Sequence, residues 1–293
     1  MFRHSLGMLC KKFSKKFAGS FSMDEQDIIR RWGTSKSGFS QVEVWDEAAA
    51  GYAEQPIPLF EHDPFLQFMD AEVGLLAGNA AQMTVLDIGC GAGGYSIALA
   101  PYVKRVVGCD LSPKMIEAAC ARAEAEQVEN VSFICDDFAT CTFDDVADGS
   151  FDIVFAHFTP ALSSGAAFQK MMKLADTWCY VAIPARRTDF VLQELRHRLG
   201  ITSTRDKRDE NCLYTFALAW LSGKTPRVEH YDDVWIDKRT LADAKEIYSN
   251  HLVATDLTSE QKAWVNDCLT LLAEDDVVYE RIETTVVMMG WHM

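Results

Sequence analysis

The stretch Val85–Gly94 reads Val-Leu-Asp-Ile-Gly-Cys-Gly-Ala-Gly-Gly, and it says more about the fold than any other part of the chain. A short apolar run contains Asp87 and ends in a cluster of glycines, and a helical pattern from Tyr95 to Ala100 follows directly. This order is typical of a strand, a tight turn and a helix start, where backbone N–H groups and the helix dipole attract polar ligands. Glycine suits such a turn because a Cβ would block a positive φ or the approach of a ligand. We therefore expect a ligand on this loop.

The acid that precedes the glycines indicates which class of ligand the loop binds. Gly89, Gly91 and Gly94 also satisfy G-x-G-x-x-G, the pattern of dinucleotide-binding loops. A carboxylate in the loop would repel a pyrophosphate and attract a cation. The run D-x-G-x-G-x-G resembles motif I of class I S-adenosylmethionine-dependent methyltransferases, whose methyl donor carries a sulfonium and an ammonium group. The resemblance implies that the donor is held by Asp87, Gly89, Cys90, Gly91 and Gly93.

A second buried strand is predicted over Arg105–Asp110. Asp110 lies about twenty residues past the loop, where doubly wound folds place a carboxylate that binds ribose hydroxyls. Ser112 is the expected N-cap of the next helix, with Pro113 in the first position. The segment that begins at Leu111 resembles the family's stretch after motif I, which implies that Asp110 and Leu111 contact the donor. A surface acid without a ligand is the alternative for Asp110.

A third strand is predicted over 130–135, and three residues of interest follow it: Asp136, Asp137 and Phe138. In the family, an acid at this strand tip binds the adenine amino group and an apolar neighbour flanks the ring. The resemblance therefore implies cofactor contacts for these residues. Asp137 fits the acid better than Asp136 when the strands are aligned, and both remain candidates.

Strand and helix patterns continue to alternate towards the C-terminus. Further strands are predicted over 151–156, 177–184, 226–236 and 277–291. This order predicts an α/β fold with a doubly wound, mostly parallel seven-stranded sheet and helices on both faces. The resemblance implies that the last strand is antiparallel and lies beside the sixth.

The chain divides into three parts on composition and pattern. Residues 1–22 form a basic stretch that we expect to be a disordered extension. Residues 23–80 form an N-terminal helical cap segment. Residues 81–293 form the methyltransferase domain, with helical insertions near 200–223 and 238–273. We expect the helices within 24–80, 186–223 and 238–273 to form a helical cap over the acceptor.

Two aromatic residues of the N-terminal segment are candidates for contact with the donor. The stretch from Trp45 to Tyr52 resembles the segment that covers the donor in many small-molecule methyltransferases. The resemblance implies that Trp45 and Tyr52 lie above the pocket. The alternative is a structural role, because aromatic residues at helical spacing commonly belong to a core.

The tip of the fourth strand reads Ala-His-Phe-Thr-Pro from Ala156, and it departs from the Asn/Asp-Pro-Pro-Tyr/Phe pattern of methyltransferases that act on amides and exocyclic amines. His157 is the candidate catalytic base, and a hydrogen-bonded structural histidine is the alternative. Phe158 is a candidate acceptor contact. Arg186 and Arg187 follow the fifth predicted strand, and guanidinium groups there suit an anionic acceptor. The alternative is that they pair with Asp189 or Glu194, or are solvated.

The composition narrows the functional classes further. The formal net charge of −15 and the pI near 4.9 argue against nucleic acid as a partner, since phosphate binders carry basic surfaces. No apolar run approaches the ~20 residues that span a bilayer. The nine cysteines lack metal-site spacing, so we expect reduced thiols, no bound metal and a cytoplasmic location.

The sequence therefore predicts an S-adenosylmethionine-dependent methyltransferase that acts on a small or medium-sized molecule. The alternatives are a nicotinamide dinucleotide-dependent oxidoreductase, which Asp87 disfavours, and a regulator that binds the donor without catalysis. Conversion of the donor to S-adenosylhomocysteine distinguishes an enzyme from such a regulator.

Overall fold

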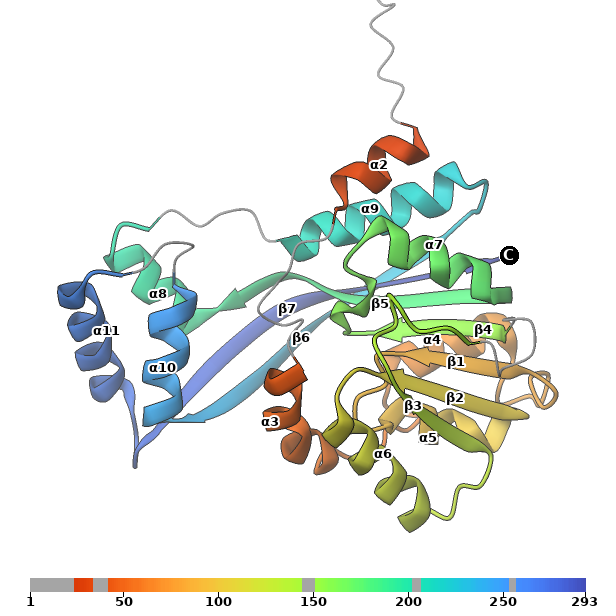
Figure 1. Cartoon of the computed structure of the whole chain (residues 1–293), viewed down its shortest axis with the longest axis horizontal. Helices are drawn as coiled ribbons and strands as arrows, with labels where there is room; N and C mark the ends of the chain where they lie inside the picture. Colours follow the sequence, from red (N-terminus) through yellow and green to blue (C-terminus); the bar gives the residue numbers. More distant parts are fainter. Residues whose placement is uncertain (1–23, 34–41, 144–150, 202–206, 253–256) are drawn as a thin grey trace, which may run out of the picture.

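The computed structural model of the protein describes residues 24–33, 42–143, 151–201, 207–252 and 257–293. The predicted basic extension 1–22 lies outside the described residues. Within them, seven strands form one sheet in the order β3-β2-β1-β4-β5-β7-β6 (Figure 1). The strands are β1 (Thr84–Ile88), β2 (Arg105–Asp110), β3 (Val131–Cys135), β4 (Phe151–His157), β5 (Ala175–Asp189), β6 (Arg227–Thr240) and β7 (Val277–His292).

The sheet is parallel except for its last strand in the chain. Strands β1 to β5 pair in parallel, whereas β7 is antiparallel to both β5 and β6. Parallel neighbours need crossover connections, and helices supply them on both faces of the sheet. This architecture confirms the predicted doubly wound α/β fold, including the antiparallel final strand beside the sixth.

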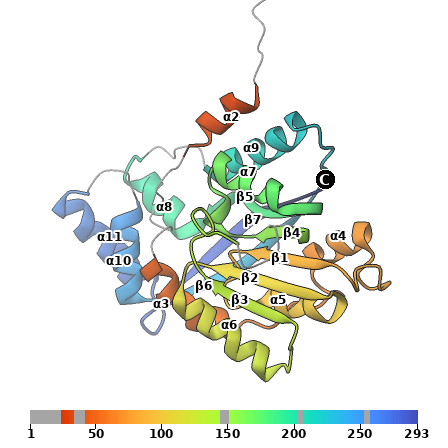
Figure 2. The ribbon, with the colours of Figure 1, turned by 45° about the vertical axis from the view of Figure 1, so that its right-hand side comes forward.

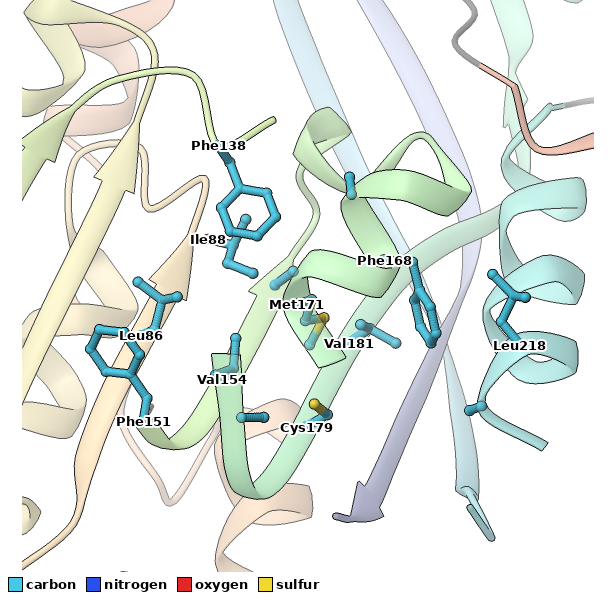
Figure 3. Packing of buried hydrophobic residues seen from close by; sticks show 14 of the residues in the cluster. Leu86, Ile88, Phe138, Phe151, Val154, Phe168, Met171, Cys179, Val181 and Leu218 are labelled. Atoms are coloured by element: carbon cyan, nitrogen blue, oxygen red, sulfur yellow. The ribbon is translucent and has the colours of Figure 1, made fainter. Parts of the chain in front are cut away.

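Helices cover both faces of the sheet, as the view in Figure 2 also shows. One face carries α2 (Glu25–Arg31), α7 (Gly165–Leu174) and α9 (Lys207–Leu221), and the other carries α4 (Pro64–Val73) and α5 (Gly94–Leu99). On the first face, Phe168 of α7 and Leu218 of α9 belong to one buried cluster with Val181 of the sheet (Figure 3). The helix α6 (Pro113–Ala125) packs on β2 and β3, and α3 (Val42–Ala53) packs on α6.

Three strands extend well beyond the others. Strand β4 pairs with β5 only as far as His157 opposite Ala182, whereas β5 continues to pair with β7 up to Asp189. The prediction ended the fifth strand at Pro184 and the sixth at Ile236, so both strands are longer than expected. A proline is tolerated in β5 because the strand has an open edge once β4 has ended.

The far end of this three-stranded extension carries its own small core. The helices α8 (Phe190–Arg198), α10 (Leu241–His251) and α11 (Ser259–Leu272) pack there (Figure 1). Their buried residues Leu195, Tyr248 and Leu269 form a cluster with Val278 of β7. Of the described helices that lie in the ranges expected to form a cap, these three gather at this end. The helices α4 and α9 lie on opposite faces of the main sheet, so their apolar sides are part of the main core.

The small core contains one buried carboxyl group. Glu280 of β7 is 2% exposed, and its Oε1 accepts a hydrogen bond of 2.8 Å from the N–H of Val191 in the first turn of α8. Its Oε2 accepts a bond from the hydroxyl of Tyr248 in α10. Burial raises the pKa of Glu280 to about 7, against the partly compensating bond from Val191. The carboxyl therefore holds β7, α8 and α10 together best when it is neutral.

Replacement of Glu280 by glutamine is expected to change how stability depends on pH. The pKa of Glu280 rises from 4.5 to about 7 on folding, so its favourable contribution is complete below pH 4.5 and is lost as the pH rises through about 7. E280Q should therefore unfold at higher denaturant concentration than the wild type at pH 8 and lose this advantage at pH 5. Denaturant titrations from pH 5 to 8 measure the difference, with E283Q on the same strand as the control, because the carboxylate of Glu283 is 43% exposed in its pair with Arg281. Parallel profiles for E280Q and the wild type would contradict it.

Candidate active site

The glycine loop between β1 and α5 adopts the backbone that the sequence requires. Gly89, Gly91 and Gly93 have φ values of +69°, +51° and +76°. The N–H groups of Gly89 and Cys90 both donate to the carbonyl of Cys109 on β2, at 2.7 and 3.1 Å. A Cβ at Gly89 would lie 2.0 Å from Oγ1 of Thr159, which follows β4. Glycine is thus needed here for its positive φ and for close approach to the β4 tip.

Asp110 links the glycine loop to the end of β2. Its Oδ2 accepts a 2.9 Å hydrogen bond from the N–H of Gly91, and its Oδ1 accepts one of 2.9 Å from the N–H of Ser112. Burial raises the pKa of this carboxyl, and hydrogen bonds from the backbone of Ser112, Gly91 and Leu111 oppose that shift. Because a carboxylate offers about four lone pairs, it can still accept a further donor such as a ribose hydroxyl. Leu111, which we also predicted to contact the donor, is half-buried next to it.

Asp87 lies beneath the loop rather than on its surface. The residue is 3% exposed, and its Oδ2 accepts a 2.7 Å bond from the hydroxyl of Ser96 in α5. Burial raises its pKa to about 7. The carboxyl therefore ties the end of β1 to α5. The predicted attraction of a cationic donor would have to act through the loop, not by direct contact.

Helix α3 covers the glycine loop. Oδ1 of Asp46 accepts a 2.5 Å bond from the hydroxyl of Ser112, and Ala49 packs with Ala92 of the loop and Met115 of α6. The loop and the start of α6 are therefore enclosed from the side of α3.

The two aromatic residues predicted to cover the donor both lie on this helix. The rings of Trp45 and Tyr52 are 6.3 Å apart, and Cδ1 of Tyr52 is 4.0 Å from where a Cβ of Gly91 would be. The tyrosine also faces the extended strands. Desolvation raises the pKa of Tyr52, Asp237 of β6 raises it further, and Arg187 of β5 opposes the rise.

The three candidate residues that follow β3 differ in exposure: the two acids are exposed and the phenylalanine is buried in the core. Asp136 and Asp137 are both exposed; their side chains accept bonds from the N–H groups of Asp137 and Ala139, at 2.8 and 2.9 Å. Phe138 is 3% exposed and packs in the main core close to Ile88 (Figure 3). This position differs from the expectation that Phe138 flanks the adenine ring. The buried ring anchors the segment that carries the two acids.

His157 lies at the end of β4 among aromatic rings. Its ring is stacked on Phe158 with centroids 4.1 Å apart, and Phe65 and Tyr95 lie at 5.0 and 4.2 Å. Desolvation lowers the pKa of His157 to about 3, so the imidazole is neutral at physiological pH. Phe158 has a φ of +52°, an uncommon value for an aromatic residue and one associated with functional strand tips.

The two arginines predicted to bind the acceptor lie inside β5, not after it. The register shifts between Ala185 and Thr188, and Arg186 has a φ of +49° at this bulge. The exposed Arg186 donates its backbone N–H to Oδ1 of Asp209, at 2.8 Å. The half-buried Arg187 forms a 2.6 Å ion pair with Asp189. The structure thus corrects the placement of both residues and shows the pairing of Arg187 that the sequence left as the alternative.

The structure also brings residues to the site that the sequence did not indicate. Tyr95 is hydrogen-bonded to both His157 and Asp63, and Trp235 of β6 lies 5.4 Å from the guanidinium of Arg187. Asp63 carries a weak signal, since Asp-Pro before an apolar run predicts a helix cap, and it does cap α4. No local pattern indicates Trp235, because it reaches the site through strand pairing alone.

The described residues also bear on metal sites, disulfides and membrane-spanning helices. No group of three or more His, Cys, Asp or Glu side chains among them is placed to hold a metal ion. Their eight cysteines are free thiols. No helix in the described part of the chain is long and apolar enough to cross a membrane.

The central part of the chain is similar to known proteins. Residues 85–177 match a family model described as a methyltransferase domain. An uncharacterized methyltransferase, YcgJ of Bacillus subtilis, is 37% identical over 90 residues, which cover 30% of this chain and 34% of that protein. A 23S rRNA (uracil(1939)-C(5))-methyltransferase, RlmD of Marinomonas posidonica, is 31% identical over 121 residues, or 39% of this chain and 27% of that protein. The chain thus spans about a third or less of these relatives.

A solved structure resembles a larger part of the chain at low identity. The crystal structure of the Bacillus YcgJ protein aligns with 76% of this chain and 98% of its own, with a TM-score of 0.43 and 16% identity.

Proposed function

We propose that this chain, which matches a methyltransferase domain over residues 85–177, is a class I S-adenosylmethionine-dependent methyltransferase that transfers a methyl group to a small or medium-sized molecule. The observation that carries the proposal is the set of hydrogen bonds by which Asp110 connects the glycine loop to the end of β2. Asp110 accepts the N–H groups of Gly91 and Ser112 there and ends β2, so it lies at the carboxyl edge of the sheet, where ligands of doubly wound folds bind.

The residues around the loop suit the donor. The loop leaves open the position of a Cβ at Gly91, which has only ordinary contacts at 3.9 Å with Met115 and 4.0 Å with Tyr52. Asp46, Asp110 and Asp136 place carboxylates around this point, and the hydrogen bond from Ser112 and the nearby cation Lys114 both lower the pKa of Asp46. A ligand with a sulfonium and an ammonium group is therefore favoured over a dinucleotide.

Methyl transfer requires few reactive groups from the protein, because the methyl group is already activated in the donor. The sulfonium of the bound donor supplies an activated methyl group. The chain must align the acceptor with it and exclude water, and such alignment can contribute up to ~7–11 kcal/mol. In the proposal Tyr52 and Trp45 cover the loop, and His157 and Phe158 face the acceptor from the end of β4. The neutral imidazole of His157 can accept the proton that a hydroxyl acceptor loses as its oxygen is methylated, and the desolvation that lowers its pKa to about 3 makes it a weak base for this step.

The acceptor need not be anionic. Arg187 is already paired with Asp189 at 2.6 Å, and Arg186 lies at an exposed bulge. Asp233, Trp235 and Asp237 alternate with outward residues on the same face of β6 as Tyr231. We therefore favour an acceptor with an uncharged or cationic group and an aromatic or apolar body.

An RNA acceptor is the second candidate, because the rRNA methyltransferase of Marinomonas posidonica matches part of this chain. The net charge of −15 favours the small molecule. Incubation with donor labelled in its methyl group, together with either total RNA or a metabolite extract, separates the two. We expect label in the metabolite fraction. Label in RNA alone would overturn the choice of acceptor, and donor binding without any turnover would support the non-catalytic regulator.

The purified protein is expected to bind S-adenosylmethionine or S-adenosylhomocysteine at micromolar concentrations and to show no affinity for NAD. The physical reason is the ring of carboxylates around the glycine loop, which attracts the donor's cationic groups and repels a pyrophosphate. Isothermal titration calorimetry with each ligand measures this directly. Tight binding of NAD without binding of the methyl donor would refute the proposed function.

A further inference from the structure

Three polar side chains from three different elements meet at the end of β4. Asp63 is the N-cap of α4, Tyr95 is in the first turn of α5, and His157 ends β4. Oη of Tyr95 lies 2.8 Å from Oδ2 of Asp63 and 3.0 Å from Nε2 of His157. Oδ1 of Asp63 accepts the N–H of Leu66 at 2.8 Å. The carboxylate is thus held by the helix, and the tyrosine hydroxyl by the carboxylate.

The directions of these bonds follow from a count of protons. A carboxylate can only accept, so the hydroxyl proton of Tyr95 must lie between Oη and Asp63. Desolvation and the nearby Asp63 raise the pKa of Tyr95, so this proton is retained. Oη then has only lone pairs to offer His157, and the proton of that second bond must come from Nε2. The reverse arrangement would leave two acceptor oxygens 2.8 Å apart with no proton between them.

The other ring nitrogen of His157 is left as an acceptor. A neutral imidazole carries one proton, so Nδ1 has a lone pair when Nε2 is protonated. Within the described residues, no hydrogen bond to Nδ1 of His157 is formed. The ring cannot turn over freely, because it is stacked on Phe158 at 4.1 Å and packed against Phe65 at 5.0 Å.

We propose that Asp63 and Tyr95 are positioning residues that hold His157 as its Nε2–H tautomer and thereby reserve Nδ1 to accept a proton from the methyl acceptor. The tautomer is independent of the proposed function, whereas the role of Nδ1 rests on it. In the transfer, the bond between methyl carbon and sulfur breaks with its electron pair going to sulfur. A new bond forms from the acceptor's oxygen or nitrogen to the methyl carbon, and the proton lost by that atom goes to Nδ1.

Replacement of Asp63 by asparagine provides a sharp test because it reverses the donor order. Asparagine also caps helices, so its Oδ1 can still accept the N–H of Leu66. Its amide nitrogen then takes the place of Oδ2 and donates to Tyr95. The tyrosine proton must turn towards Nε2 of His157, and the histidine must carry its own proton on Nδ1. D63N is therefore expected to exchange the tautomer, and Tyr95→Phe to leave a mixture.

The readout is the pair of ring ¹⁵N shifts of His157 in protein labelled with ¹⁵N-histidine and free of ligand. The signals are assigned by their loss in His157→Gln. The controls are Asp70→Asn, which alters a carboxylate that accepts the N–H of Leu76 at 2.8 Å, and Tyr102→Phe, whose ring contacts Phe60 instead. Both controls should keep the wild-type shifts, because neither residue touches the histidine.

The outcomes separate the positioning role from the proposed function. A wild-type Nε2–H tautomer that becomes Nδ1–H in D63N supports the inference. A wild-type Nδ1–H tautomer, or identical shifts in the wild type and D63N, overturns it. Once a methyl acceptor has been identified, D63N should lower kcat by ~100-fold while the KM for the donor is unchanged. If the tautomer changes as expected but the wild-type protein methylates no acceptor, the proposed function fails and the positioning role stands.

Discussion

Replacement of Phe65 by alanine is expected to lower the free energy of unfolding by about 3–5 kcal/mol. Phe65 is fully buried in α4, and its ring lies 5.8 Å from Tyr95, 5.9 Å from Phe155 and 5.0 Å from His157. The loss combines the transfer free energy of the ring with the cavity left behind, because rings on rigid strands and helices collapse only in part. The same change removes one wall of the environment that holds the imidazole of His157.

Denaturant unfolding monitored by circular dichroism measures this loss. The control is Leu59→Ala, which removes an apolar side chain that is 58% exposed close to the same helix. That control should change the free energy of unfolding by less than ~0.5 kcal/mol. A loss below ~1 kcal/mol for F65A would show that Phe65 does not support the core under the site.

Asp110→Ala is expected to weaken binding of the methyl donor by roughly 1.5–3 kcal/mol, a loss of about one to two orders of magnitude in affinity. Charge-assisted hydrogen bonds to the ribose hydroxyls would be lost. The structure adds a second cause, because the carboxylate also accepts the N–H groups of Gly91 and Ser112, each at 2.9 Å. The glycine loop would therefore lose its support from β2 as well.

Calorimetric titration with S-adenosylhomocysteine compares D110A with the wild type. Asp176→Ala is the matched control, since it removes the same charge from an exposed position at the opposite end of the sheet, near the start of β5. D176A should bind the ligand like the wild type. The variant D110A should remain folded, because one loop and one helix start are affected and the core is not. Equal affinities for D110A and the wild type would remove Asp110 from the donor site.

Most of the fold was predictable because its parts are local patterns. Each of the strands β1 to β4 is a short apolar run before a turn, and each prediction ends within a residue or two of the observed bounds. Asp110 was predictable for the same reason, since its place depends only on its distance from the glycine loop. The extension of β5 past Pro184 was not, because that residue is unfavourable in a strand with two neighbours and acceptable in one with an open edge.

In the candidate site, too, the residues that local sequence patterns specify could be predicted, and those that depend on tertiary packing could not. Gly89, Gly91 and Gly93 could be assigned from the sequence, because a positive φ is a demand on a single residue. Phe138 could not, since the sequence does not say whether an apolar side chain after a strand turns towards a ligand or into the core. Arg187 could not be placed either, because it pairs with Asp189 inside a strand that continues past the register shift between Ala185 and Thr188.

The sequence by itself determined the class of the sheet, the glycine loop and the acid at the end of β2, because each depends on residues close together in the chain. Only the tertiary structure decided which side chains surround His157. Asp63, Tyr95 and His157 are far apart in sequence and come from a helix cap, a helix turn and a strand end. They meet because α4 and α5 pack on the same face of the sheet, against residues of β4. Contacts of this kind follow from packing between elements, and no periodic pattern within any one element records them.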